Sequence, residues 1–146
     1  MRITQTFTIA CPPEAVFDYV TDVRTLRDWQ TSKTRVEALT AGPPRQGYRV
    51  REWTKPPGMR EFQQIAEFAE FDRPHRLRVK VVEGPQPIDG TWTFTATETG
   101  TRVLFVAEGA LRGPMRLAGP IVARVMSRQF AHYHDRLRHN LEVPAV

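Results

Sequence analysis

The sequence predicts an α+β domain in which a curved antiparallel sheet of seven strands wraps around one long C-terminal helix. Three observations predict it. The run Pro120–Glu142 repeats apolar residues with the period of an amphipathic helix. Before it, apolar and polar residues alternate in short segments, which is typical of half-buried strands. Glycine and proline turn signals separate those segments, so consecutive strands should pair as an antiparallel meander.

The N-terminal part of the chain predicts one strand and then two short helices. Arg2–Ala10 alternates apolar residues with threonine and arginine, and two prolines end the strand. Glu14–Val20 is expected to form the first helix, because proline suits the first helical turn. Thr21 or Asp22 is expected to be the N-cap of the second helix, Val23–Trp29.

Six further strands are expected between these helices and the C-terminal run. Turn residues bound each of them. Their expected ranges are Thr34–Leu39, Gly47–Trp53, Arg60–Phe71, Arg76–Val82, Gly90–Ala96 and Thr101–Gly109. No internal repeat or linker divides the chain, so residues 1–146 are expected to form a single domain.

The C-terminal helix has one face that should lie on the core. With about 100° of rotation per residue, its apolar side chains and one glutamine fall along a single stripe that shifts slowly around the helix. The stripe contains Ile121, Val122, Val125, Met126, Gln129, Phe130, Tyr133, Leu137 and Leu141. A helix of about 23 residues would be about 35 Å long, so it would cross the whole domain.

The positive charge of the chain does not by itself indicate a nucleic-acid partner. The formal net charge is +5, and arginine supplies 18 of the 21 basic residues. The basic residues are dispersed, with no long basic run and no alternation with aromatic residues of the RNA-binding kind. We therefore expect a solvated basic surface, no nucleic acid, and at most weak contact with an anionic membrane.

The sequence lacks the features of a membrane span, a disulfide, a metal site and a cofactor site. No apolar run approaches the roughly 18 residues that span a membrane, and the chain opens directly as a strand, so a cytoplasmic location is expected. Cys11 is the single cysteine and cannot form an internal disulfide. His132, Asp135 and His139 share one helical face, but arginines border that face, so no metal is expected there. Phosphate-binding and metal motifs are missing from the sequence, so no cofactor is expected.

Five segments occur in a recognisable order along the chain. They are Pro13–Trp29, Gly47–Arg49, Glu70–Pro74, Gly100–Val103 and Leu137–Glu142. Together they resemble the START-like (SRPBCC) helix-grip superfamily of polyketide cyclases/dehydrases and lipid-transport proteins. The resemblance implies a helix-grip fold with a cavity between sheet and helix that binds an apolar or amphipathic molecule. It does not choose among functions, because this fold hosts carriers, sensors and enzymes.

Placing the apolar phase of each strand inward predicts the wall of that cavity. The ligand-binding residues expected from this phase are Trp29, Val50, Phe62, Gln64, Phe68, Val79, Trp92, Phe94, Phe105, Val122, Met126, Gln129 and Phe130. Large aromatic rings and a flexible methionine suit an adaptable apolar pocket. The alternative is a dry core in which these side chains fill one another's space.

Three residues are candidates for acid–base chemistry in the cavity. The strand phase points Glu52 inward, where an unpaired carboxylate is costly, so it would need a ligand or a partner. Tyr48 and Tyr133 could present hydroxyl groups to a ligand carbonyl. The alternatives are a wet Glu52 beside an arginine at the strand end and two ordinary core tyrosines.

Three hypotheses about function follow. The first is a cytoplasmic carrier or sequestering protein for a small hydrophobic or amphipathic molecule, such as a lipid, polyketide or isoprenoid. The second is a polyketide cyclase or aromatase that positions its substrate and assists by acid–base catalysis, so the sequence leaves carrier and enzyme both open. The third is an interaction module that uses the basic surface. A monomer and a homodimer are both compatible with the sequence.

Overall fold

The computed structural model describes residues 1–111 and 113–143, so positions 112 and 144–146 of the expected domain lie outside the described residues. The elements follow one another as two short helices after the first strand, six more strands, a 3-10 helix and a long helix. Their bounds are β1 Arg2–Ile9, α1 Pro13–Thr21, α2 Leu26–Trp29, β2 Lys33–Ala38, β3 Arg49–Thr54, β4 Phe62–Asp72, β5 Arg76–Glu83, β6 Ile88–Thr97, β7 Gly100–Gly109, η1 Gly113–Arg116 and α3 Gly119–Glu142. The predicted fold class is confirmed.

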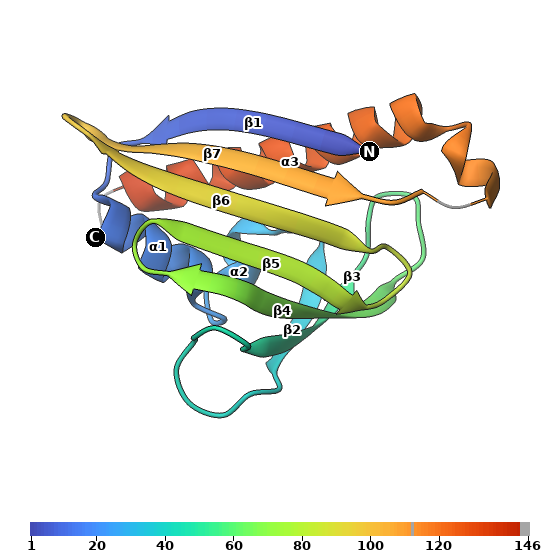
Figure 1. The fold of residues 1–146 in the computed structure, drawn as a ribbon, viewed down its shortest axis with the longest axis horizontal. Coiled ribbons are helices and arrows are strands. Elements are labelled where there is room, and N and C mark those ends of the chain that lie inside the picture. The colour runs from blue at the N-terminus through green and yellow to red at the C-terminus, as the bar shows by residue number, and fades with distance from the viewer. Residues whose placement is uncertain (112, 144–146) are drawn as a thin grey trace.

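The seven strands form one sheet in the order β1-β7-β6-β5-β4-β3-β2. Neighbouring strands are antiparallel throughout. The first strand therefore pairs with the last, and the remaining strands follow as a meander. In Figure 1, α3 runs behind β1 and β7 along the long axis of the molecule, α1 lies behind the same sheet near its left-hand end, and α2 lies nearer its centre.

The start of the second short helix differs from the prediction. Thr21 belongs to α1, where its hydroxyl donates to the carbonyl of Phe17 at 2.9 Å. The Asp22 carboxylate accepts from the backbone N–H of Arg24 at 2.9 Å and from its guanidinium, and this local bonding holds a turn in place of a helix. Thr25 occupies the N-cap position of α2 instead. The predicted N-cap is therefore wrong by a few residues.

Strand β4 does not keep a strict two-residue alternation. Its pairing with β5 shifts between Ile65 and Ala66 and again between Phe68 and Glu70. The extra residue at the first shift lies in β5, so Gln64, Ala66 and Phe68 keep one facing. At the second shift it lies in β4, so Phe68 and Phe71 both lie on the inner side, with ring centroids 6.1 Å apart. Phe62, placed inward by simple alternation, is only half-buried, and it lies outside the core cluster.

The long helix α3 matches its predicted range, but its first turns are not covered by the sheet. Ile121 and Val125 were expected on the core face, yet 69% and 61% of their surfaces are exposed. This expectation is wrong because the first turns of α3 project beyond the start of β1, at the right-hand end of Figure 1. The second half of the helix is gripped by the sheet, and there Tyr133 and Leu137 are buried.

Candidate ligand-binding site

Two adjoining cavities lie between α3 and the sheet. The outer cavity has a volume of about 520 Å³, and the inner cavity has a volume of about 90 Å³. Val81 at the end of β5 and Ile88 at the start of β6 line both of them. These two half-buried side chains therefore form the boundary between a wide outer space and a narrow inner one.

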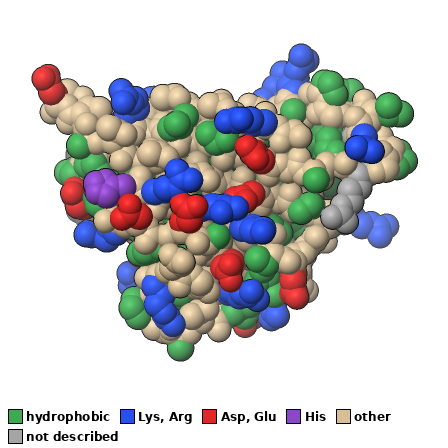
Figure 2. All heavy atoms as spheres, viewed as in Figure 1, with side chains coloured by type: hydrophobic (Ala, Val, Ile, Leu, Met, Phe, Trp, Pro, Cys, Tyr) green, Lys and Arg blue, Asp and Glu red, His purple; other side chains and the backbone are tan. Residues whose placement is uncertain are grey.

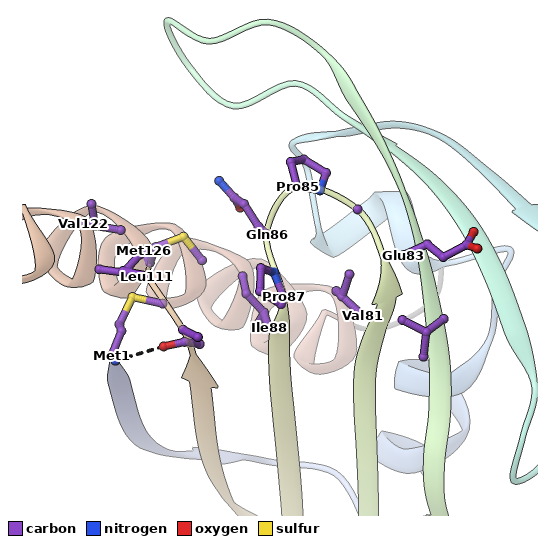
Figure 3. A pocket seen from close by; sticks show the side chains of 14 residues that line it. Met1, Val81, Glu83, Pro85, Gln86, Pro87, Ile88, Leu111, Val122 and Met126 are labelled. Atoms are coloured by element: carbon purple, nitrogen blue, oxygen red, sulfur yellow. Dashed lines mark hydrogen bonds between the residues drawn. The ribbon is translucent and has the colours of Figure 1, made fainter. Parts of the chain in front are cut away.

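The outer cavity is built from the ends of strands, the loop between β5 and β6, and the first half of α3. Figure 3 shows Met1, Leu111, Val122 and Met126 gathered on the helix side, opposite Val81, Pro87 and Ile88. Glu83 directs its carboxylate away from the helix in the same view. The wall is thus mainly apolar, and its two unbranched methionine side chains can adapt to different shapes.

The inner cavity lies against the concave face of the sheet and is closed by α2 and α3. Its wall consists of Val20, Leu26, Trp29, Gln30, Lys33, Val50, Glu52, Gln64, Ala66, Phe68, Leu77, Val79, Val81, Ile88, Gly90, Trp92, Phe105 and Phe130. A glycine at position 90 lets an aromatic ring lie directly on β6, since an added Cβ would stand 3.2 Å from Cε1 of Phe105. Most of this wall is aliphatic or aromatic, and its polar members form one group.

That polar group is centred on a buried ion pair. Nζ of Lys33 lies 3.4 Å from Oε2 of Glu52, and the two side chains are only 8% and 7% exposed. Gln64 faces Glu52 across the β3–β4 pairing and donates its side-chain N–H to Oε1 at 2.9 Å. Lys33 also donates to the side-chain oxygen of Gln30. The inward position of Glu52 is therefore balanced by a lysine, and no arginine at a wet strand end is involved.

Trp29 brings an unpaired hydrogen-bond donor to the same wall. Its side chain is fully buried, and its Nε1 has no acceptor among the described residues. The ring lies nearly parallel to that of His134 and edge-on to that of Trp92, with centroids 6.4 and 6.2 Å away. A buried N–H without an acceptor is costly, so an acceptor that reached Nε1 would be favourable.

His134 is a central residue of the core, although its place there was not predicted from the sequence. It accepts a hydrogen bond at Nε2 from the indole N–H of Trp92 at 3.1 Å, so its Nδ1–H donates to Oε1 of Gln5 at 2.8 Å. Gln5 in turn donates to the backbone oxygen of Ser127 at 2.7 Å. Burial lowers the pKa of His134 to about 3, so the ring is neutral and ties β1, β6 and α3 together. Its spacing from Phe130 and Leu137 is the signal that could have revealed it.

The structure distributes the expected ligand-binding residues over three environments. Those that line the inner cavity are Trp29, Val50, Gln64, Phe68, Val79, Trp92, Phe105 and Phe130, together with the acid–base candidate Glu52. Val122 and Met126 line the outer cavity. Phe62, Phe94, Gln129, Tyr48 and Tyr133 line neither cavity.

The residues outside the cavities have other partners. Phe94 lies under α1, 5.7 Å from the ring of Phe17, because β6 carries it past the end of the cavity. Tyr48 stacks on Phe68 at 5.5 Å. The Tyr133 hydroxyl accepts from the side-chain N–H of Gln129 at 2.7 Å, and Gln129 also donates to Ser32. A common inward phase was therefore not enough to place these side chains on the cavity wall.

The helix face with His132, Asp135 and His139 is exposed. Over residues 1–111 and 113–143, no three His, Cys, Asp or Glu side chains come close enough together to hold a metal ion. In the same ranges no helix is both long and apolar enough to cross a membrane.

Comparison with known families identifies the chain. The family model described as polyketide cyclase / dehydrase and lipid transport matches residues 1–142. The chain belongs to this family. A comparison with curated proteins finds no match, so this polyketide cyclase/dehydrase and lipid-transport family is the level at which the sequence is placed.

Solved structures agree with the START-like fold of the family. Protein TTHA0849 from Thermus thermophilus has a TM-score of 0.82 at 22% identity, with 97% of each chain covered. A START superfamily protein from Mycobacterium smegmatis has a TM-score of 0.78 at 16% identity, also with 97% of each chain covered. SA2116 from Staphylococcus aureus, described as a protein of unknown function, has a TM-score of 0.79 at 15% identity and covers 97% of this chain and 93% of its own. At such identities the likeness shows the fold alone.

Proposed function

We propose that this family member is a cytoplasmic carrier or sequestering protein for a small hydrophobic or amphipathic molecule. The observation that carries the proposal is the outer cavity, whose apolar walls lead to the inner cavity at Val81 and Ile88. Its volume of about 520 Å³ falls in the usual range for small-molecule sites. The inner cavity, at about 90 Å³, has room only for the tip of such a molecule.

The polar group of the inner cavity indicates what that tip should be. The indole N–H of Trp29 lacks an acceptor among the described residues, and the opposite charges of Lys33 and Glu52 already balance each other. A carboxylate would bring an uncompensated charge into a buried site, whereas a carbonyl or hydroxyl oxygen would not. The expected ligand therefore carries a neutral oxygen at one end of an apolar body, and burial of that body supplies about 25 cal/mol per Å².

The first test is native mass spectrometry of freshly purified protein, followed by organic extraction of any bound molecule. A hydrophobic compound with a neutral oxygen at one end is the expected result. A matched pair of variants then locates it: Val81→Trp fills the boundary between the cavities, and Leu104→Trp adds the same ring to the exposed side of β7. Retention of the compound should fall in Val81→Trp alone. Equal retention in two folded variants would contradict the cavity assignment.

A second candidate function is acid–base catalysis on a bound polyketide, and the position of Glu52 favours it. The carboxylate lines the inner cavity beside Lys33, where both groups would be close to a substrate oxygen. Tyr48 and Tyr133 lie outside the cavity wall, so Glu52 and Lys33 are the residues of the candidate acid–base site. The test is cyclisation of a poly-β-ketone by the wild type and by Glu52→Gln. A wild type without turnover, or a variant with undiminished turnover, would remove this candidate.

A further inference from the structure

Three apolar side chains at the beginning of α3 face solvent. Leu117, Ile121 and Val125 are 91%, 69% and 61% exposed, and we call them the exposed row. They follow one another at intervals of four residues, so Ile121 and Val125 lie on one face of α3 with Leu117 just before it. Single exposed apolar residues are ordinary, but two on one helix face with a third just before the helix are typical of a contact surface.

Exposed arginines accompany the exposed row, and the stretch of sequence that contains it has no acidic residue. Arg116, Arg124 and Arg128 are exposed. Residues 109–134 contain four arginines and no aspartate or glutamate. The rest of the chain holds 17 basic and 16 acidic residues, so four of the five excess positive charges belong to this segment. Figure 2 shows green and blue side chains but no red ones at the right-hand end, where Figure 1 places η1 and the start of α3. The arginines are dispersed along the sequence as expected, but the acidic residues that would balance them all lie outside residues 109–134.

The helix geometry places the exposed row between the arginines and the outer cavity. Val122 and Met126, which line that cavity, each follow a member of the row by one residue, or about 100° around the helix. Arg124 and Arg128 each follow a member by three residues, which places them about 60° to the other side. The apolar row is therefore flanked by cavity wall on one side and by positive charge on the other.

We propose that the exposed row and its arginines dock the protein on an anionic lipid bilayer. An amphipathic helix with arginines beside an apolar row lies in the membrane interface, where its apolar side chains reach the acyl boundary. Guanidinium groups bind lipid phosphates in a bidentate manner, and a segment free of carboxylates adds no repulsion. Nucleic acid would use the arginines but leave the apolar row in water, so lipid explains both features. The docking does not depend on whether the cavity binds a ligand.

Flotation with lipid vesicles tests this proposal on the full chain. The probes are phosphatidylcholine vesicles with and without phosphatidylglycerol, at low and high salt. The expected result is binding to the anionic vesicles, weakened by salt. Arg124→Gln/Arg128→Gln should lower the partition coefficient by about thirtyfold, and Ile121→Gln/Val125→Gln should also lower it strongly.

Two matched controls test whether the position of the change matters. Arg27→Gln/Arg136→Gln removes the same charge from exposed positions elsewhere, and Met59→Gln removes an exposed apolar side chain from a loop. Both controls should bind as the wild type does.

Several outcomes would overturn the proposal. One is a wild type that does not bind anionic vesicles at low salt. Another is an equal loss in Arg27→Gln/Arg136→Gln, which would mean that only net charge matters. Light scattering that shows a dimer, converted to a monomer by Ile121→Gln/Val125→Gln, would assign the exposed row to a second copy of the chain. Binding to an oligonucleotide that depends on Arg124 and Arg128 but not on Ile121, without vesicle binding, would assign the face to nucleic acid.

Discussion

Replacing Lys33 by methionine removes one partner of the buried ion pair and keeps most of the side-chain length. Its ammonium lies 3.4 Å from Oε2 of Glu52, and neither side chain is more than 8% exposed. Loss of the ammonium leaves the carboxylate buried with one remaining hydrogen bond, from Gln64. Breaking one side of such a pair costs about 3–5 kcal/mol, and the surviving bond favours the lower end, about 3 kcal/mol.

Urea denaturation followed by circular dichroism measures this loss. With a slope of about 1–3 kcal/mol per molar urea, the midpoint should fall by about 1–3 M while the slope stays the same. The control is the double variant Lys33→Met/Glu52→Gln, in which no charge is left buried. It should be clearly more stable than Lys33→Met alone, and a double-mutant cycle gives the size of the coupling.

Two results would refute the reasoning. A loss below about 1 kcal/mol in Lys33→Met would mean that water reaches the pair and screens it, as for exposed salt bridges. Additive losses in the double variant would mean that the two side chains do not interact. Either result would also remove the charge-balance argument for a neutral ligand tip.

Three further predictions concern stability. Leu137→Ala empties a fully buried site on α3 and should cost about 2–5 kcal/mol in unfolding free energy. Ile121→Ala, on the exposed part of the same helix, should change it by less than about 0.5 kcal/mol. Comparable losses in the two variants would contradict the exposed position of the first turns of α3. Gly90→Val brings a Cβ to 3.2 Å from Phe105 and should cost about 1–3 kcal/mol in urea denaturation, and an unchanged midpoint would mean that the inner cavity is wider than described. Burial lowers the pKa of His134 from 6.5 to about 3, so as the pH falls the unfolded chain takes up a proton before the folded chain does. The contribution of the neutral ring to stability is therefore complete above pH 6.5 and is lost as the pH falls toward 3. Between pH 7 and pH 5 the wild type should lose about 2 kcal/mol more than His134→Gln, and parallel pH profiles would refute the neutral assignment.

Much of the fold could be predicted because local patterns and tertiary structure agree. In β7, Val103 and Phe105 alternate with Arg102 and Leu104, and the sheet buries the first pair. In β4 the pattern was not sufficient, because two irregular pairings depend on how β5 fits beside it. The sequence of residues 62–72 alone does not indicate where its pairing with β5 becomes irregular.

The candidate site was predictable in part, for a related reason. Strand phase brought Glu52, Val50 and Phe105 to the inner cavity. Lys33 was missed because it begins a strand, where a lysine ordinarily reaches solvent, and only the fold brings it beside Glu52. The helix pattern could not show where the sheet ends, so Ile121 was assigned to the core although it lies beyond the core.

The pairing of β1 with β7 has a consequence for biosynthesis. Arg2 lies opposite Glu108, and Ile9 lies opposite Thr101, so the first strand of this domain must wait for the last strand before its hydrogen bonds form. Until then Ile3 and Phe7 stay on an unpaired edge in the nascent chain, which is the kind of segment that aggregates. Such long-range closure also slows folding. Chaperone demand should therefore be greatest while residues between β1 and β7 are being translated, and it should fall once β7 and α3 have left the exit tunnel.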